Sequence, residues 1–189
     1  MGLDPDAMRV VLEPEDVVRG LRRVAGEILE RHRGSEGLVV VGIRRGGELV
    51  ARELVRRLRD IEGRDVPMGS IDITMYRDDV ATASPNPRIG PSAMPNNLAG
   101  SSVILVDDVL YTGRTIRAAL DAVLDYGRPK RIELAVLIDR GGRELPIQPN
   151  YVVRRLELEP SERIDVLERA EGLLAILQPA NAPSIPPPS

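Results

Sequence analysis

Apolar residues recur along this chain at two spacings, one typical of amphipathic helices and one typical of strands. The helical spacing predicts helices at residues 14–32, 48–61 and 115–126. Alternation and short apolar runs predict strands at residues 10–12, 37–43, 66–76, 103–106 and 132–138, and a hairpin formed by residues 163–168 and 173–177. Strands that alternate with helices imply an α/β fold with a mainly parallel, twisted sheet and helices on both faces.

Two segments lack any periodicity. Residues 81–100 are rich in Pro, Asn, Ser and Gly, and such a stretch inside a compact domain is either a lid over a site or disordered; we favour the lid. Residues 178–189 are rich in proline, and we expect a disordered tail there. The remaining length, residues 1–177, suits a single domain.

Composition excludes several classes of protein. No apolar run approaches the roughly 18 residues of a membrane span, and the N-terminus has no signal-peptide pattern, so we expect a cytoplasmic protein with no membrane contact. The chain has no Cys, which excludes disulfides and thiolate zinc sites. Its one histidine, His32, lies in a predicted last helical turn before Gly34, where capping explains it better than catalysis. A net charge of −3 and the absence of Phe and Trp argue against a generally basic or base-stacking nucleic-acid binder.

The most informative stretch runs from Val103 to Leu120. A short apolar strand is followed by the adjacent carboxylates Asp107 and Asp108, then by a polar turn and a helix. The first turn of a helix carries unpaired N–H groups and partial positive charge, which favour a phosphate. Gly113 lets the backbone approach that phosphate closely. The sequence therefore predicts a socket for a phosphorylated sugar.

The carboxylates suit the other end of such a ligand. Asp107 and Asp108 are hydrogen-bond acceptors for ribose hydroxyls, and they can help to hold a hydrated Mg²⁺ that bridges to substrate phosphates. The Walker pattern is absent because Lys130 is the only lysine, and no dinucleotide fingerprint follows a strand. The alternative is that the acid pair ends a strand and the turn is an ordinary one.

The segment resembles the phosphoribosyl-pyrophosphate signature of type I phosphoribosyltransferases, a fold with a flexible lid loop and a small hood. The flanking motifs narrow the resemblance: IDITMYRDD (71–79), DDVLYTGRT (107–115), LAVLIDRG (134–141) and RELPI (143–147) together resemble the bifunctional pyrimidine operon regulators, the PyrR family. The match runs from about Val10 to Leu167, and the hood with the C-terminal hairpin would cover about residues 139–177.

The resemblance implies two activities. One is a uracil phosphoribosyltransferase, which converts uracil and phosphoribosyl pyrophosphate to UMP and pyrophosphate with Mg²⁺. The other is regulation of pyrimidine operon expression, in which the protein binds the mRNA leader in response to UMP or UTP and changes transcription attenuation or translation. A homodimer or higher homo-oligomer is also implied. The alternative is a type I phosphoribosyltransferase for orotate or a purine, with no RNA-binding role.

The resemblance also assigns roles to individual residues. Catalysis would fall to Asp107, Asp108 and Arg77, with Mg²⁺ held through the substrate by the two aspartates. Phosphoribosyl pyrophosphate would be bound by the whole signature: Val103, Ile104, Leu105, Val106, Asp107, Asp108, Val109, Leu110, Tyr111, Thr112, Gly113, Arg114 and Thr115. A pyrophosphate loop would comprise Arg44, Arg45 and Gly46. The uracil hood would comprise Ile138, Asp139, Arg140, Leu145, Pro146 and Ile147. Basic residues that could serve RNA are Arg19, Arg22, Arg23, Arg128, Lys130 and Arg131.

Plainer interpretations exist for several of these. Arg77 could be a surface ion-pair partner of Asp78 or Asp79, residues 143–147 could be an ordinary loop, and each basic residue could belong to a solvated face. The chain also departs from the family: the first β-α turn lacks the usual Thr-Arg-Gly, and Gly142 stands where a histidine is common. The first departure puts catalytic efficiency in question.

Overall fold

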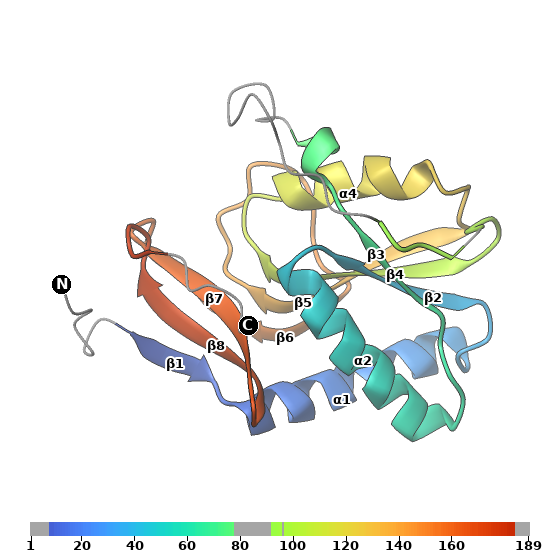
Figure 1. Ribbon diagram of the computed structural model, residues 1–189, viewed down its shortest axis with the longest axis horizontal. Coiled ribbons are helices and arrows are strands. Elements are labelled where there is room, and N and C mark those ends of the chain that lie inside the picture. The colour runs from blue at the N-terminus through green and yellow to red at the C-terminus, as the bar shows by residue number, and fades with distance from the viewer. Residues whose placement is uncertain (1–7, 78–91, 96, 184–189) are drawn as a thin grey trace.

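The computed structural model describes residues 8–77, 92–95 and 97–183, and it contains two sheets (Figure 1). The larger sheet has the order β3-β2-β4-β5-β6, and all its neighbouring strands are parallel. Its strands are β2 (Leu38–Ile43), β3 (Met68–Ile71), β4 (Ser102–Leu110), β5 (Arg131–Asp139) and β6 (Tyr151–Arg155). The helices are α1 (Pro14–His32), α2 (Gly46–Glu62), α4 (Arg114–Leu124) and the short 3₁₀ helix η2 (Thr74–Tyr76).

The parallel sheet is buried on both faces, which explains its near-continuous apolar strands. Along β2, Val40 packs into the core shared with α1 and α2, whereas Val41 packs into the core shared with α4. Figure 1 shows α1 and α2 on one side of the sheet and α4 on the other. The predicted α/β class with helices on both faces is confirmed.

Local chemistry sets where the helices begin and how closely they approach the sheet. A capping box between Glu13 and Asp16 starts α1, with Pro14 in its first turn. Gly42 on β2 brings α2 close, because a Cβ at that position would lie 2.7 Å from the Cα of Glu48. The start of α2 is therefore held against the ends of the central strands.

A three-stranded antiparallel sheet joins the two ends of the chain in the order β1-β8-β7. Its strands are β1 (Arg9–Leu12), β7 (Glu162–Arg169) and β8 (Gly172–Pro179). Ile164, Leu173 and Leu177 from this sheet belong to the same core as α1 and α2. β7 and β8 form the hairpin expected from the sequence, but β8 continues through Pro179 and buries Gln178, so residues 178 and 179 do not belong to the expected tail. Residues 184–189 lie outside the described residues.

Three predictions of secondary structure differ from the observed elements. The strand expected over residues 66–76 is β3 alone, because the Asp72 side chain accepts a hydrogen bond from the Thr74 N–H at 2.9 Å and turns the chain into η2. β4 passes through the acid pair to Leu110, since β5 is long enough to pair with it there. β6 was not predicted; only Tyr151 among its residues is fully buried, so its sequence has little apolar signal.

The segment predicted as a lid is described only in part, at residues 92–95 and 97–100. That part is anchored: Ala93 pairs with Ser70 of β3, and Leu98 is fully buried with its N–H donating to the carbonyl of Tyr126. These residues are thus part of the packed domain and not of a lid. Residues 81–91 and Asn96 lie outside the described residues. No helix in the described chain is long and apolar enough to cross a membrane.

Candidate functional site

A cavity of about 320 Å³ opens where β2 and β4 end and the chain leaves β3. The carboxyl ends of parallel strands are where ligands of α/β proteins bind. The residues lining the cavity come from four separate segments: Ile43, Arg44, Arg45, Gly46, Asp72, Ile73, Thr74, Arg77, Asp107, Asp108, Val109 and Thr115. The fold therefore brings together the predicted acid pair, the first β-α turn, Arg77 and the start of α4.

The acid pair is the least ordinary electrostatic feature of this cavity. Asp107 is 5% exposed, and its carboxylate accepts a hydrogen bond from the Asp108 N–H at 3.0 Å. Asp108 accepts one from the Val109 N–H at 2.8 Å. Burial, followed by the charge of Asp108, raises the pKa of Asp107 well above its usual value, and burial also raises the pKa of Asp108. A ligand that supplies donors or cations would relieve this cost.

Two glycines let the start of α2 press against the acid pair. A Cβ on Gly46 would collide with the Asp108 carboxylate, and a Cβ on Gly47 would lie 2.5 Å from the Val106 carbonyl oxygen and 2.9 Å from the Cα of Asp107. The peptide bond between Arg44 and Arg45, directly before this helix, is cis. The Arg44 guanidinium lies 3.7 Å from the Glu48 carboxylate one turn into the helix. The turn formed by Arg44, Arg45, Gly46 and Gly47 thus fits closely around Asp108.

The predicted phosphate turn, residues 111–115, also has the expected local form. Gly113 precedes α4 with a φ of +92°, a conformation that a side chain would strain. The Arg114 N–H donates to the Thr112 hydroxyl at 3.3 Å, and Thr115 in the first helical turn lines the cavity. The first-turn amides and the helix dipole make this end of α4 suitable for an anion.

Part of the predicted hood is joined directly to that turn. The Glu144 and Leu145 N–H groups donate to the Thr112 carbonyl at 3.0 and 3.1 Å. The side chains of Leu145 and Ile147 pack on Gly113, where an added Cβ would lie 3.3 to 3.5 Å from them. Glu144 also accepts from the Arg114 Nε at 2.6 Å. Residues 143–147 are therefore tied to the phosphate turn and are not a free surface loop.

Several residues of the predicted signature act from inside the cores. The alternating apolar side chains of β4 are almost fully buried, on opposite faces of the sheet: Val103, Ile104, Leu105, Val106 and Leu110. Ile138 on β5 is buried in the same way. Their side chains set the position of the acid pair and the hood, and they do not reach the cavity.

The end of β5 carries a stacked arginine. The Arg140 guanidinium lies 4.0 Å from the centre of the Tyr111 ring, and the residue is only 8% exposed. Gly142 packs against the Cδ2 and Cε2 atoms of the same ring, so closely that a Cβ at this position would collide with them. The absence of a side chain at Gly142 therefore makes room for Tyr111.

The residues predicted for RNA lie away from this cavity. On α1, Arg19 pairs with Asp16, and Arg23 pairs with Glu27 and donates to the carbonyls of Val152 and Val153. The turn between α4 and β5 carries the exposed residues Arg128 and Lys130, and the exposed Arg131 begins β5. His32 bonds to Glu133 at 2.8 Å, so its side chain serves the packing of α1 on β5.

Among the described residues, no group of three or more His, Cys, Asp or Glu side chains is placed to hold a metal ion by itself. Asp72, Asp107, Asp108 and Thr115 nevertheless all line the cavity. Oxygen donors of this kind suit Mg²⁺, which usually keeps waters and shares substrate phosphates as ligands. The donor set fits a metal that arrives with its substrate better than a permanently bound one.

Comparison with known proteins places this geometry in a family. The model of the phosphoribosyl transferase domain matches residues 11–166. The bifunctional protein PyrR of Pelotomaculum thermopropionicum is 50% identical over 174 residues, covering 85% of this chain and 96% of that protein. The chain belongs to the PyrR family. Another member, the bifunctional protein PyrR of Geobacter sulfurreducens, is 54% identical over 158 residues, covering 84% of this chain and 89% of that protein.

Solved structures with much lower identity confirm the fold alone. A hypoxanthine phosphoribosyltransferase of Trypanosoma cruzi superposes with a TM-score of 0.67 at 20% identity, over 90% of this chain and 97% of that one. A hypoxanthine-guanine phosphoribosyltransferase of Bacillus anthracis gives 0.65 at 17% identity, over 89% and 96%. The predicted resemblance to the PyrR family and to the type I phosphoribosyltransferase fold is therefore confirmed.

Sequence reasoning missed some of the residues that build the cavity. Asp72 and Thr74 line it, although the predicted strand would have hidden this turn. Gly47 lies just outside the predicted pyrophosphate loop, yet it sets the distance between α2 and β4. Arg143 lies within the RELPI motif, but the resemblance assigns it no role. The turn at Asp72 and Thr74 does have a sequence signal, because an Asp side chain often accepts a hydrogen bond from the backbone N–H two residues later and so closes a turn.

Proposed function

We propose that the protein is a uracil phosphoribosyltransferase that also regulates pyrimidine operon expression in response to UMP or UTP. The observation that carries the proposal is the joint cavity, which Asp107, Asp108, the start of α2 and Thr115 line together, and the hood is hydrogen-bonded to Thr112 just before Thr115. Membership of the PyrR family supports both activities, because relatives that match nearly end to end are named bifunctional proteins.

In the transfer reaction, the ribosyl C1 gains positive charge as pyrophosphate leaves. Asp107 and Asp108 would accept hydrogen bonds from the ribose hydroxyls and place negative charge near that carbon. The turn from Tyr111 to Thr115 would bind the 5-phosphate and so fix the sugar. Because the pKa values of both acids are raised, a ligand that brings hydrogen-bond donors or a cation would stabilise their ionised forms.

The leaving group would lie on the other side of the cavity. Arg44, Arg45 and Gly46 would contact the pyrophosphate, and Arg77 would approach it from the turn after β3. Asp107 and Asp108 would hold Mg²⁺ together with the substrate, and the ion would offset the pyrophosphate's charge when bound. Backbone groups of residues 138–140 and 145–147 would read the uracil edge, since side chains such as Ile138 are buried.

A base panel tests the enzymatic half. The protein is incubated with phosphoribosyl pyrophosphate, Mg²⁺ and labelled uracil, orotate, hypoxanthine or guanine, and nucleotide formation is measured. We expect UMP from uracil and little product from the other bases. A nucleotide formed from orotate or a purine, with none from uracil, would support the alternative of a phosphoribosyltransferase for another base.

Binding of pyrimidine-operon leader RNA tests the regulatory half. Affinity is measured with and without UMP across a salt series, and we expect binding that UMP changes and that weakens as salt rises. The exposed residues Arg22, Arg128 and Lys130 are candidates for the contact, so replacing all three with Gln should reduce the salt dependence. RNA binding that neither UMP nor salt affects would contradict this half of the proposal. Assembly into a homodimer or larger homo-oligomer stays a prediction from the resemblance.

A further inference from the structure

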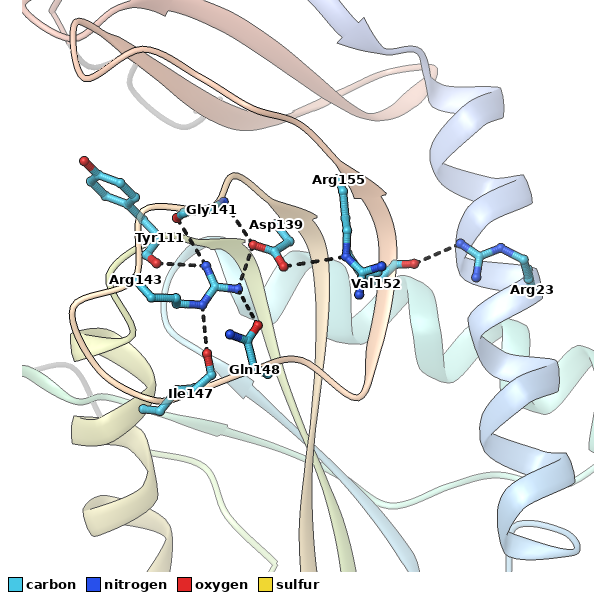
Figure 2. A network of polar contacts seen from close by, with 9 residues as sticks. All are labelled: Arg23, Tyr111, Asp139, Gly141, Arg143, Ile147, Gln148, Val152 and Arg155. Atoms are coloured by element: carbon cyan, nitrogen blue, oxygen red, sulfur yellow. Dashed lines mark hydrogen bonds and ion pairs between the residues drawn. The ribbon is translucent and has the colours of Figure 1, made fainter.

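The side chain of Arg143 lies at the centre of a polar network that joins the phosphate turn to the hood (Figure 2). Its Nε donates to the Ile147 carbonyl at 2.8 Å. Its Nη1 donates to the Tyr111 carbonyl at 2.9 Å and to the Gly141 carbonyl at 3.2 Å. Its Nη2 donates to the Asp139 carboxylate at 2.7 Å and, more weakly, to the Gln148 side-chain oxygen at 3.4 Å.

These contacts use the whole hydrogen-bonding capacity of the guanidinium. An arginine has five N–H groups, and each has an acceptor here. The side chain is only 14% exposed, and the Asp139 side chain that faces it is 9% exposed. Arg143 therefore has no donor left for a phosphate or a base unless one of these bonds breaks.

The acceptors belong to two different parts of the proposed site. Tyr111 begins the phosphate turn, whereas Asp139, at the end of β5, and Ile147 belong to the hood. The Thr112 carbonyl meanwhile accepts from two backbone N–H groups of the hood, and Ile147 packs on Gly113. One side chain thus fixes the distance between the segment expected to hold the sugar phosphate and the segment expected to hold the base.

Figure 2 also shows what distinguishes Arg143 from its neighbour Arg155. Arg155 approaches the same Asp139 carboxylate, but at 3.9 Å and with a side chain that is 72% exposed. It supplies charge near Asp139 without bridging the turn and the hood, so its removal separates the effect of charge from the effect of the bridge.

We propose that Arg143 is a positioning residue that couples the base site to the phosphate site, so that a ligand occupying both binds more tightly than the phosphate turn alone allows. The inference rests on the proposed function, because it takes UMP as a ligand of this site. It assigns Arg143 no direct contact with substrate. Without the guanidinium, the turn would still bind a sugar phosphate, but the hood would no longer be held at the distance that a nucleotide spans.

The test compares UMP with ribose 5-phosphate by calorimetry in the full-length protein and in Arg143→Met. We expect ribose 5-phosphate affinity to stay within about twofold and UMP affinity to fall about tenfold, the usual size of a coupling between two sites. In steady-state assays the KM for uracil should rise while the KM for phosphoribosyl pyrophosphate is little changed. Arg155→Met should alter neither ligand's affinity.

Thermal unfolding of each variant shows whether it is folded, and Arg143→Lys supplies a second test because it keeps the charge but cannot form the bridge. We expect Arg143→Lys to lose UMP affinity selectively, to a smaller extent. Equal losses for both ligands, or an unchanged ratio in both Arg143 variants, would overturn the inference. So would a variant that loses leader RNA binding while its UMP affinity is unchanged. If the wild-type protein instead bound UMP no more tightly than ribose 5-phosphate, the proposed function itself would be refuted.

Discussion

Buried carboxylates lie on the neighbouring strands β4 and β5, and their surroundings are opposite. Near the start of β5, Glu133 is 4% exposed and is surrounded by donors and cations. His32 Nε2 lies 2.8 Å from it, the Tyr151 hydroxyl donates to it at 2.7 Å, and Arg31 and Arg131 lie within ion-pair distance. Near the end of β4, Asp107 and Asp108 are instead adjacent to one another and accept backbone N–H groups.

The pKa directions follow from these surroundings. Burial by itself would raise the pKa of Glu133, but the hydrogen bonds from His32 and Tyr151 and the charge of Arg31 outweigh burial and lower it. At the acid pair, burial and like charge act together, and the pKa of Asp107 is well above its usual value. A carboxylate with matched partners stabilises the fold. A pair of carboxylates whose ionisation costs free energy in the folded protein is instead expected where a ligand supplies the missing partners.

The strongest test of this contrast is the double replacement of Asp107 and Asp108 with Asn. UMP formation should fall about 1,000-fold, because two groups that stabilise transition-state charge are lost. Stability at pH 7 should be unchanged or higher, since two carboxylates with raised pKa values no longer have to be ionised in the folded state. Activity is measured with uracil and stability by denaturant unfolding.

The matched control replaces the exposed acids Asp60 and Asp65 with Asn, which removes the same charge from the surface. It should change neither activity nor stability appreciably. If the double variant at positions 107 and 108 retained activity, the acid pair would be structural, and the contrast between the two ends of the sheet would disappear.

A smaller loss should come from Gly46→Ala, which keeps both carboxylates but displaces one. The added methyl group would collide with the Asp108 carboxylate, the flexible end of a side chain, so the backbone should adjust little. We expect UMP formation to fall about 100-fold, the order of loss that a misplacement of about 1 Å can cause. The melting temperature should change little, because the collision is with a side chain and not with the core.

Gly26→Ala is the control for this substitution, since a Cβ on Gly26 in α1 would meet nothing within 4 Å. It should raise the free energy of unfolding by about 1 kcal/mol through helix propensity and leave activity unchanged. Full activity in Gly46→Ala would show that the position of Asp108 against α2 is not important for catalysis.

The elements that were predictable from sequence are those whose signal is local. The apolar runs of β2, β4 and β5 follow from burial on both faces of a parallel sheet, and the segments at their carboxyl ends converge because topology requires it. For that reason the acid pair, the first β-α turn and Thr115 could be placed at one cavity from sequence and resemblance together.

The rest depends on partners that are distant in the chain. A single Asp72 side chain ends β3, although the alternation of apolar residues continues beyond it. Arg143 reads as one more surface arginine until the carbonyl of Tyr111, 32 residues away, is brought beside it. Glu133 lies within an otherwise apolar run, and its partner His32 lies 101 residues away. The spacing of apolar residues and the secondary-structure propensities of single residues carry no information about such contacts.

The smallest expected effect comes from the other end of the sheet, with Glu133→Gln. The amide oxygen can still bond to His32 and Tyr151, but the NH2 group takes the place of the oxygen that faces Arg31 and Arg131, so the free energy of unfolding should fall by about 2 kcal/mol at pH 7. UMP formation should stay within about twofold of wild type, because Glu133 does not line the cavity. Glu30→Gln, on the exposed side of α1, should leave stability unchanged and serves as the control.

The pH dependence of this loss separates an ionic cause from a packing cause. Because folding lowers the pKa of Glu133 below the value of 4.5 for the free side chain, its ionised form stabilises the protein fully above that pH. The stabilisation is lost as the pH falls through the folded-state pKa, where both states bind the proton. The gap in unfolding free energy between wild type and Glu133→Gln should therefore be constant from pH 7 to about pH 5 and should narrow at lower pH. A gap that stayed constant through acid conditions would mean that shape and not charge holds α1 to β5, and the electrostatic contrast with the acid pair would then be wrong.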